Sequence, residues 1–124
     1  MIKTTLGAIA TGVFLMGASS SAQAGECGYQ QCWGAVAFGP SGKISYAYGL
    51  WSERAAYRKA VKSCKGACSE VRTFYNECAA VSRGANWKWS WSKAPTRRLA
   101  ESRANAACSS TSSDCKVIVW ACSR

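Results

Sequence analysis

Two segments of the chain decide its fold: CKGACSEVRTFYNEC, residues 64–78, and CSSTSSDCKVIVWAC, residues 108–122. Both segments begin and end with cysteine, have the same length, and hold one further cysteine between their ends. A stretch with helical spacing precedes each segment, and an alternating aromatic stretch precedes that helix. Self-similarity of this kind indicates an internal repeat. The sequence therefore predicts two copies of one unit, over about residues 32–78 and 78–122.

The first copy has the pattern strand, strand, helix, strand. Apolar residues 33–38 and alternating residues 43–50 flank the turn sequence Gly-Pro-Ser-Gly at 39–42, which predicts a hairpin. Ser52 is a good helix N-cap, and Gly66 would follow the end of the helix near Cys64. A last strand should run from Cys68 to Cys78. At helical spacing, the residues expected to face the core are Ala56, Tyr57, Ala60, Val61 and Cys64.

The second copy repeats this order. Residues 78–81, a turn at 83–86 and an aromatic strand at 87–91 lead to a helix that begins near Pro95. The last strand, 116–122, is apolar on both faces, which is typical of a central strand. We predict an α+β domain in which an antiparallel sheet, built from two pseudo-symmetric strand-strand-helix-strand repeats, packs on two helices. The second helix should turn inward Leu99, Ala100, Ala104, Ala107 and Cys108.

Aromatic side chains alternate along the second strand of each copy. Trp87, Trp89 and Trp91 share one face of their strand, and Tyr46 and Tyr48 occupy matching positions in the first copy. Core packing is the favoured interpretation, because a small sheet must bury one face and aromatic rings bury the most area. Stacking on the bases of a single-stranded nucleic acid is the alternative.

The amino terminus has the features of a secretory signal peptide. A short cationic start precedes an apolar run, and Ala22-Gln23-Ala24 fits the small-x-small pattern of a cleavage site. We expect residues 1–24 to be removed and residues 25–124 to form a single disulfide-rich domain. The apolar run is too short to span a bilayer, which takes about 20 residues. The mature chain is thus expected to be exported, periplasmic or extracellular, without a transmembrane segment.

All eight cysteines follow residue 24, and an even number in an exported chain indicates disulfides. Zinc is disfavoured, since the chain has no histidine and no Cys-x-x-Cys pair. A competing set of bonds would join Cys32 to Cys122 and Cys27 to Cys78. Equivalent positions in the two copies favour Cys64 with Cys68, Cys108 with Cys115, and Cys78 with Cys122 as a lock between the halves. Cys27 and Cys32 then remain as a short amino-terminal loop.

The chain is strongly basic, with 16 Lys and Arg against 6 Asp and Glu. Without Lys3 the mature net charge is +9, which favours an acidic partner. An ordinary solvated helix face is the alternative interpretation, but mixed charges would serve solubility better than these cations. The candidate binding residues are Arg54, Arg58, Lys59, Lys62 and Lys65 on the first helix, and Arg97, Arg98 and Arg103 on the second.

Catalysis is not indicated. The chain has no histidine to shuttle protons, and its six carboxylates are scattered with no convergent pair. Cysteines could act as nucleophiles only if they were unpaired. We predict no enzyme, no catalytic residue, no metal and no cofactor.

Several stretches carry a resemblance to a known family. Trp33-Gly34-Ala35-Val36-Ala37-Phe38, Tyr46-Ala47-Tyr48-Gly49, the helix that ends at Cys64 and Trp120-Ala121-Cys122-Ser123 resemble the bacterial secreted family called domain of unknown function 4189. The resemblance implies a small secreted domain with paired cysteines and no settled activity. Cys27 and Cys32 are additions to the family pattern.

These observations lead to one functional expectation and one alternative. We expect an exported basic interaction module that recognises an acidic protein, as a secreted effector or as an inhibitor or immunity protein would. The alternative is a polyanion binder, with nucleic acid or an anionic envelope polymer as its ligand.

Overall fold

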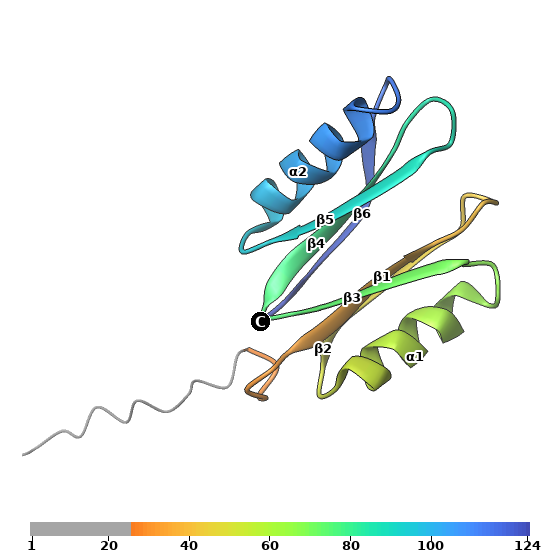
Figure 1. The fold of residues 1–124 in the computed structure, drawn as a ribbon. Coiled ribbons are helices and arrows are strands. Elements are labelled where there is room, and N and C mark those ends of the chain that lie inside the picture. The colour runs from red at the N-terminus through yellow and green to blue at the C-terminus, as the bar shows by residue number, and fades with distance from the viewer. Residues whose placement is uncertain (1–25) are drawn as a thin grey trace, which may run out of the picture.

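The computed structural model describes residues 26–124, so the predicted signal peptide lies outside the described residues. The fold is α+β (Figure 1). Within the described residues the elements follow in the order β1 (Trp33–Phe38), β2 (Ile44–Leu50), α1 (Glu53–Cys64), β3 (Glu70–Tyr75), β4 (Glu77–Arg83), β5 (Trp89–Ala94), α2 (Arg97–Ser109) and β6 (Lys116–Ser123).

The strands form two antiparallel sheets rather than the one sheet that the sequence predicts. The first sheet has the order β2-β1-β3 and the second has the order β5-β4-β6. The prediction that residues 116–122 form a central strand is wrong, because β4 occupies the centre and β6 the edge. β6 is apolar on both faces for another reason: Val117 packs towards α2, and Val119 packs towards the first sheet.

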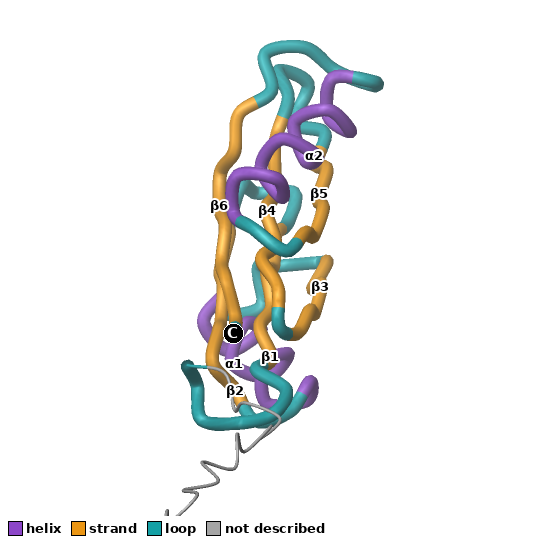
Figure 2. Tube along the Cα trace, turned by 90° about the vertical axis from the view of Figure 1, so that its left-hand side faces the viewer, coloured by secondary structure: helices purple, strands orange, loops and turns teal. Residues whose placement is uncertain are grey.

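The elements stack in four layers, with α1 and α2 outermost and the two sheets between them (Figure 1). Figure 2, turned by 90°, again places the two helices at opposite ends of the molecule. The inner core lies between the sheets. Val36, Phe38 and Phe74 from the first sheet meet Ala79, Val81, Val119 and Ala121 from the second. Sheet-on-sheet packing of this kind leaves each helix in contact with the outer face of its own sheet.

Each helix packs on its sheet through alanines. Ala56 and Ala60 of α1 lie against Ala35 and Ala37, and α2 packs through Ala100 and Ala104 in the same way. Small residues on both sides allow a close approach, so a narrow stripe at every fourth position is enough to form the contact. The broader inward faces predicted from the sequence are wrong at four positions, which are exposed: Tyr57, Val61, Leu99 and Ala107.

One buried serine also ties each helix to its sheet. The Ser45 hydroxyl donates to the carbonyl of Ala60 in α1, at 2.6 Å. The Ser82 hydroxyl donates to the side chain of Asn105 in α2, also at 2.6 Å. Buried hydroxyl groups need such partners, because an unsatisfied one costs about 1–3 kcal/mol. These bonds fix the position of each helix along the strands beneath it.

The four favoured cysteine pairings are confirmed, and the competing set is not formed. Cys64–Cys68 and Cys108–Cys115 each link the end of a helix to the segment that follows it. Cys78 and Cys122 are register partners on β4 and β6. Their bond therefore joins neighbouring strands of the second sheet, and the expectation that it locks the two halves together is wrong.

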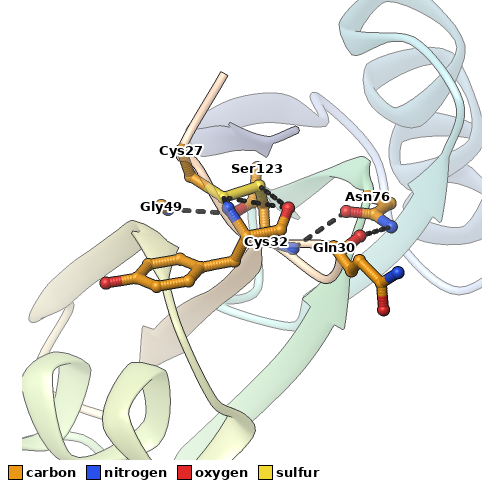
Figure 3. The surroundings of a disulfide bond; sticks show 7 residues. Cys27, Gln30, Cys32, Gly49, Asn76 and Ser123 are labelled. Carbon is orange, nitrogen blue, oxygen red and sulfur yellow. Dashed lines mark hydrogen bonds between the residues drawn. A yellow bond between two sulfur atoms is a disulfide. The ribbon is translucent and has the colours of Figure 1, made fainter. Parts of the chain in front are cut away.

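Hydrogen bonds around the Cys27–Cys32 disulfide hold the amino-terminal loop on the first half, and one of them joins the first half to the second (Figure 3). The Asn76 side chain, at the junction of β3 and β4, accepts from the Cys32 N–H and donates to the Gln30 carbonyl, both at 2.9 Å. The N–H of Gly49 in β2 donates to the Ser123 hydroxyl of β6, at 2.9 Å. The amino-terminal loop thus belongs to the fold, and β2 is tied to β6 at one end.

Candidate binding surfaces

The first candidate surface is the outward side of α1. Ser52 caps the helix, accepting a hydrogen bond from the Ala55 N–H at 3.0 Å, and Lys65 ends it in the left-handed conformation. With Ala56 and Ala60 turned to the sheet, the cations point to solvent. All five are exposed, and we call them the α1 cations: Arg54, Arg58, Lys59, Lys62 and Lys65.

The α1 cations have no acidic partner within residues 26–124. The ion pairs found there are Arg72–Glu70, Lys93–Glu77 and Arg97–Glu101. The nearest acidic residue in sequence, Glu53, accepts a hydrogen bond from the Thr73 hydroxyl at 3.1 Å. The positive charge of α1 is therefore left to solvent or to a ligand.

The three predicted cations of α2 are placed differently. Arg97 pairs with Glu101, and its guanidinium carbon lies 3.7 Å from the centre of the Trp120 ring. Arg103 donates to the Lys93 carbonyl at 3.4 Å. Two of the three α2 cations thus make contacts within the fold, whereas Arg98 is simply exposed.

The eight predicted binding residues do not form one surface. α1 and α2 are opposite outer layers of the molecule (Figure 1). The α1 cations therefore lie on one layer, and Arg97, Arg98 and Arg103, which belong to α2, lie on the other. A single flat partner can contact one of these layers at a time. The two groups must therefore be considered as separate candidate sites.

A groove that sequence reasoning missed lies between the edge strands of the two sheets. It has a volume of 520 Å³, and its walls include Ile44, Tyr46 and Tyr48 from β2 and Ile118 and Trp120 from β6. We call it the β2–β6 groove. It adjoins the end where Gly49 and Ser123 tie the two strands together.

The tyrosines of the groove are not core residues, so that prediction is wrong for them. Tyr46 and Tyr48 are 52% and 60% exposed, and their rings stack with centroids 6.3 Å apart and planes 9° apart. Trp89 and Trp91 do pack against the inner core, as expected. Trp87 does not, because it precedes β5 in the hairpin turn with φ of 62° and is 55% exposed.

The described residues hold neither a free thiol nor a cluster of metal-binding side chains. All eight cysteines are in disulfides, so no thiolate is available there as a nucleophile. Within residues 26–124, no three acidic, histidine or cysteine side chains come together as a metal site. The part of the chain that the structure describes also has no helix long and apolar enough to cross a membrane.

Fold and surfaces together define a small α+β domain stapled by four disulfides. The family model "Domain of unknown function (DUF4189)" matches residues 33–122, and the chain belongs to that family. Among solved structures, the NMR structure of Rv1813c from Mycobacterium tuberculosis is similar, with a TM-score of 0.61 and 28% sequence identity. That match covers 73% of this chain and 74% of the other. No curated protein matches the chain.

Proposed function

We propose that this protein is an exported recognition module that binds an acidic protein through the α1 cations. The observation that carries the proposal is five exposed cations on one helix with no acidic partner in the described residues. Like charges at this spacing repel one another, so an acidic ligand would relieve a repulsion that the fold leaves uncompensated. A secreted effector, an inhibitor or an immunity protein could each act in this way.

A protein partner fits this surface better than a long polyanion does. The twelve residues of α1 span roughly 18 Å, which is the scale of one patch in a protein interface. Two of the α2 cations are used inside the fold, so the basic surface does not continue as a track around the molecule. A scaffold stapled by four disulfides would also lose little conformational entropy on docking.

Charge reversal on α1 tests the proposal. Arg58→Glu combined with Lys62→Glu should lower the affinity for an acidic protein partner by more than about tenfold, because both cations become repulsive. Arg98→Glu combined with Lys88→Glu is the matched control, since both residues are exposed and lie outside α1 and the change in net charge is the same. Capture from periplasmic and culture fractions, quantified by mass spectrometry, would compare both with the natural protein. Equal capture by all three would contradict the proposal.

Salt dependence separates the polyanion alternative. Binding to an oligonucleotide or an anionic polymer should weaken log-linearly with salt, with a slope that counts the phosphates neutralised. A packed protein interface should be far less sensitive to salt. A steep fall in the affinity of the captured ligand with salt, absent in the α1 variant, would show that the α1 cations bind a polyanion rather than a protein.

We also propose that the two halves are pseudo-symmetric copies of one ancestral unit. Each has the same element order, and the first strand of each is central in its sheet. Ser52 and Thr96 cap the two helices at equivalent places, each four residues before an inward-facing alanine. Significant similarity between the two halves in an alignment of many family members would support a duplication.

A further inference from the structure

We propose that the β2–β6 groove binds an extended, acidic segment of a partner protein, which adds a strand to the edge of β2. This second site goes beyond the α1 surface, and it rests on the proposed function only for the acidic character of the partner. It is argued from the sheet edge, from the exposed aromatic rings and from the charges around them.

The edge of β2 is available for pairing. β2 is bonded to β1 on one side, and no other strand of residues 26–124 pairs with it in its sheet. An edge strand presents unpaired N–H and C=O groups, which an extended peptide can satisfy by strand addition. Gly49, with φ of 71°, turns its own N–H to Ser123. That bond ties the end of β2 to β6, and the groove begins beyond it.

The exposed rings of Tyr46 and Tyr48 are spaced like alternate side chains of a β-strand. Tyr46 and Tyr48 are two residues apart, so both side chains project from the same face of β2. Side chains of an added strand have the same two-residue repeat, and alternate ones would meet these rings. Ile118 and Trp120 form the facing wall. Tyrosine and tryptophan are the side chains that most often dominate binding energy in such pockets.

The charges around the groove favour an acidic occupant over a second copy of this chain. Lys43 precedes β2 and Lys116 begins β6, and neither has an acidic partner in the described residues. Lys59 lines a neighbouring hollow on β2 together with Tyr46 and Tyr48. A second copy would bring the same positive surplus and be repelled, whereas carboxylates beside the added strand would be attracted.

A titration followed by NMR tests the proposal on the complete oxidised protein, labelled with ¹⁵N. The probe is an acetylated and amidated peptide of alternating valine and glutamate, about eight residues long to match β2. We expect shifts of the backbone amides of β2 and of the Trp120 indole N–H. Methylating one of the two alternate sets of peptide amides should abolish binding, because one set faces β2, while methylating the other should be tolerated.

Variants identify the contacts. Tyr46→Ala combined with Tyr48→Ala should lower the affinity for the peptide by more than about tenfold, since both rings are lost from the site. Tyr75→Ala, on the opposite edge of the same sheet, is the matched control and should leave the affinity within about threefold. Both tyrosines of the groove are exposed, so the double variant should keep the amide spectrum of the folded protein outside β2.

Three results would overturn the groove proposal. The first is no shift in β2 at about 1 mM peptide, which is the weakest binding that would count as a site. The second is equal loss of affinity on methylating either set of amides. The third is a thymidine oligonucleotide of similar length that binds the groove more tightly than the peptide, which would indicate a nucleic acid ligand. Loss of partner capture in the α1 variant would leave the proposed function standing in each case.

Discussion

The second strands of the two halves, β2 and β5, occupy equivalent positions but meet different surroundings. Trp89 and Trp91 of β5 pack against the inner core. The ring centres of Trp89 and Phe38 are 5.3 Å apart, and the guanidinium carbon of Arg72 lies 5.5 Å from the centre of the Trp91 ring. Tyr46 and Tyr48 of β2 have no such cover and are exposed. The same pattern therefore gives buried aromatics in one half and a groove in the other, because the sheets cover each other unequally.

The two helices also differ in whether their cations have partners within the fold. Two arginines of α2, Arg97 and Arg103, contact Glu101, Trp120 and the backbone of β5, whereas the α1 cations have no acidic partner in the described residues. A surface whose charges are satisfied internally contributes to the fold, and one whose charges are not is available to a ligand. The comparison teaches that, where two halves share one order of elements, function is best sought where one half departs from the other.

Removing disulfides should produce the largest change in the free energy of unfolding. Cys78→Ala with Cys122→Ala should cost about 4 kcal/mol of unfolding free energy, because that bond closes a separation of 44 residues. Removing either Cys64–Cys68 or Cys108–Cys115, which close 4 and 7 residues, should cost about 2 kcal/mol. Urea denaturation measures all three. Equal losses would mean that loop entropy does not govern these bonds.

Overpacking the helix contacts should produce an intermediate effect, similar in both halves. Ala60→Leu and Ala104→Leu each place three extra carbon atoms where the alanine is fully buried, and each should cost about 1–3 kcal/mol. Ala106→Leu, on the exposed side of α2, is the control and should be nearly neutral. Thermal unfolding provides the readout. A large loss in one half alone would show that the two helix layers are not packed alike.

The smallest expected effect concerns the arginines. Arg97→Ala should cost about 0.5–1 kcal/mol, because its contacts with Trp120 and Glu101 are lost at a largely exposed site. Arg58→Ala, which removes an α1 cation without a partner, should change stability by less than about 0.3 kcal/mol. Both values come from urea denaturation at low salt. A larger loss at Arg58 would indicate that this side chain supports the fold.

Local features were predictable from the sequence. The hairpin turn at 39–42 and the Ser52 cap follow from residue types at fixed spacing, and the structure confirms them. The structure also confirms the four favoured cysteine pairings over the competing set that spacing leaves open. The alternation at 43–50 also predicts a strand, which the structure shows as β2, Ile44–Leu50. The turn, the cap and the strand depend on neighbours close in sequence, so residue types alone indicate them.

The relation between the two units was not predictable in this way. Whether Tyr46 faces a core or solvent depends on how far the second sheet extends over β2, and no spacing within β2 reports it. The composition of β6 is the one signal in the sequence. Edge strands usually carry charged side chains, whereas β6 carries Ile118 and Trp120. A strand that is apolar on both faces indicates a central strand, so the sequence of β6 alone does not reveal the groove.

The N–H of Cys27 donates to the carbonyl of Arg124, at 3.1 Å, so the two ends of the described chain are neighbours. A tag or fluorophore attached at Arg124 would sit beside the hollow formed by Tyr48, Gly49 and Ser123. Immobilisation through that end would crowd the groove and weaken any signal from it. A label in the loop at Ser109–Ser113, at the far end of α2, would report binding without obstructing either surface.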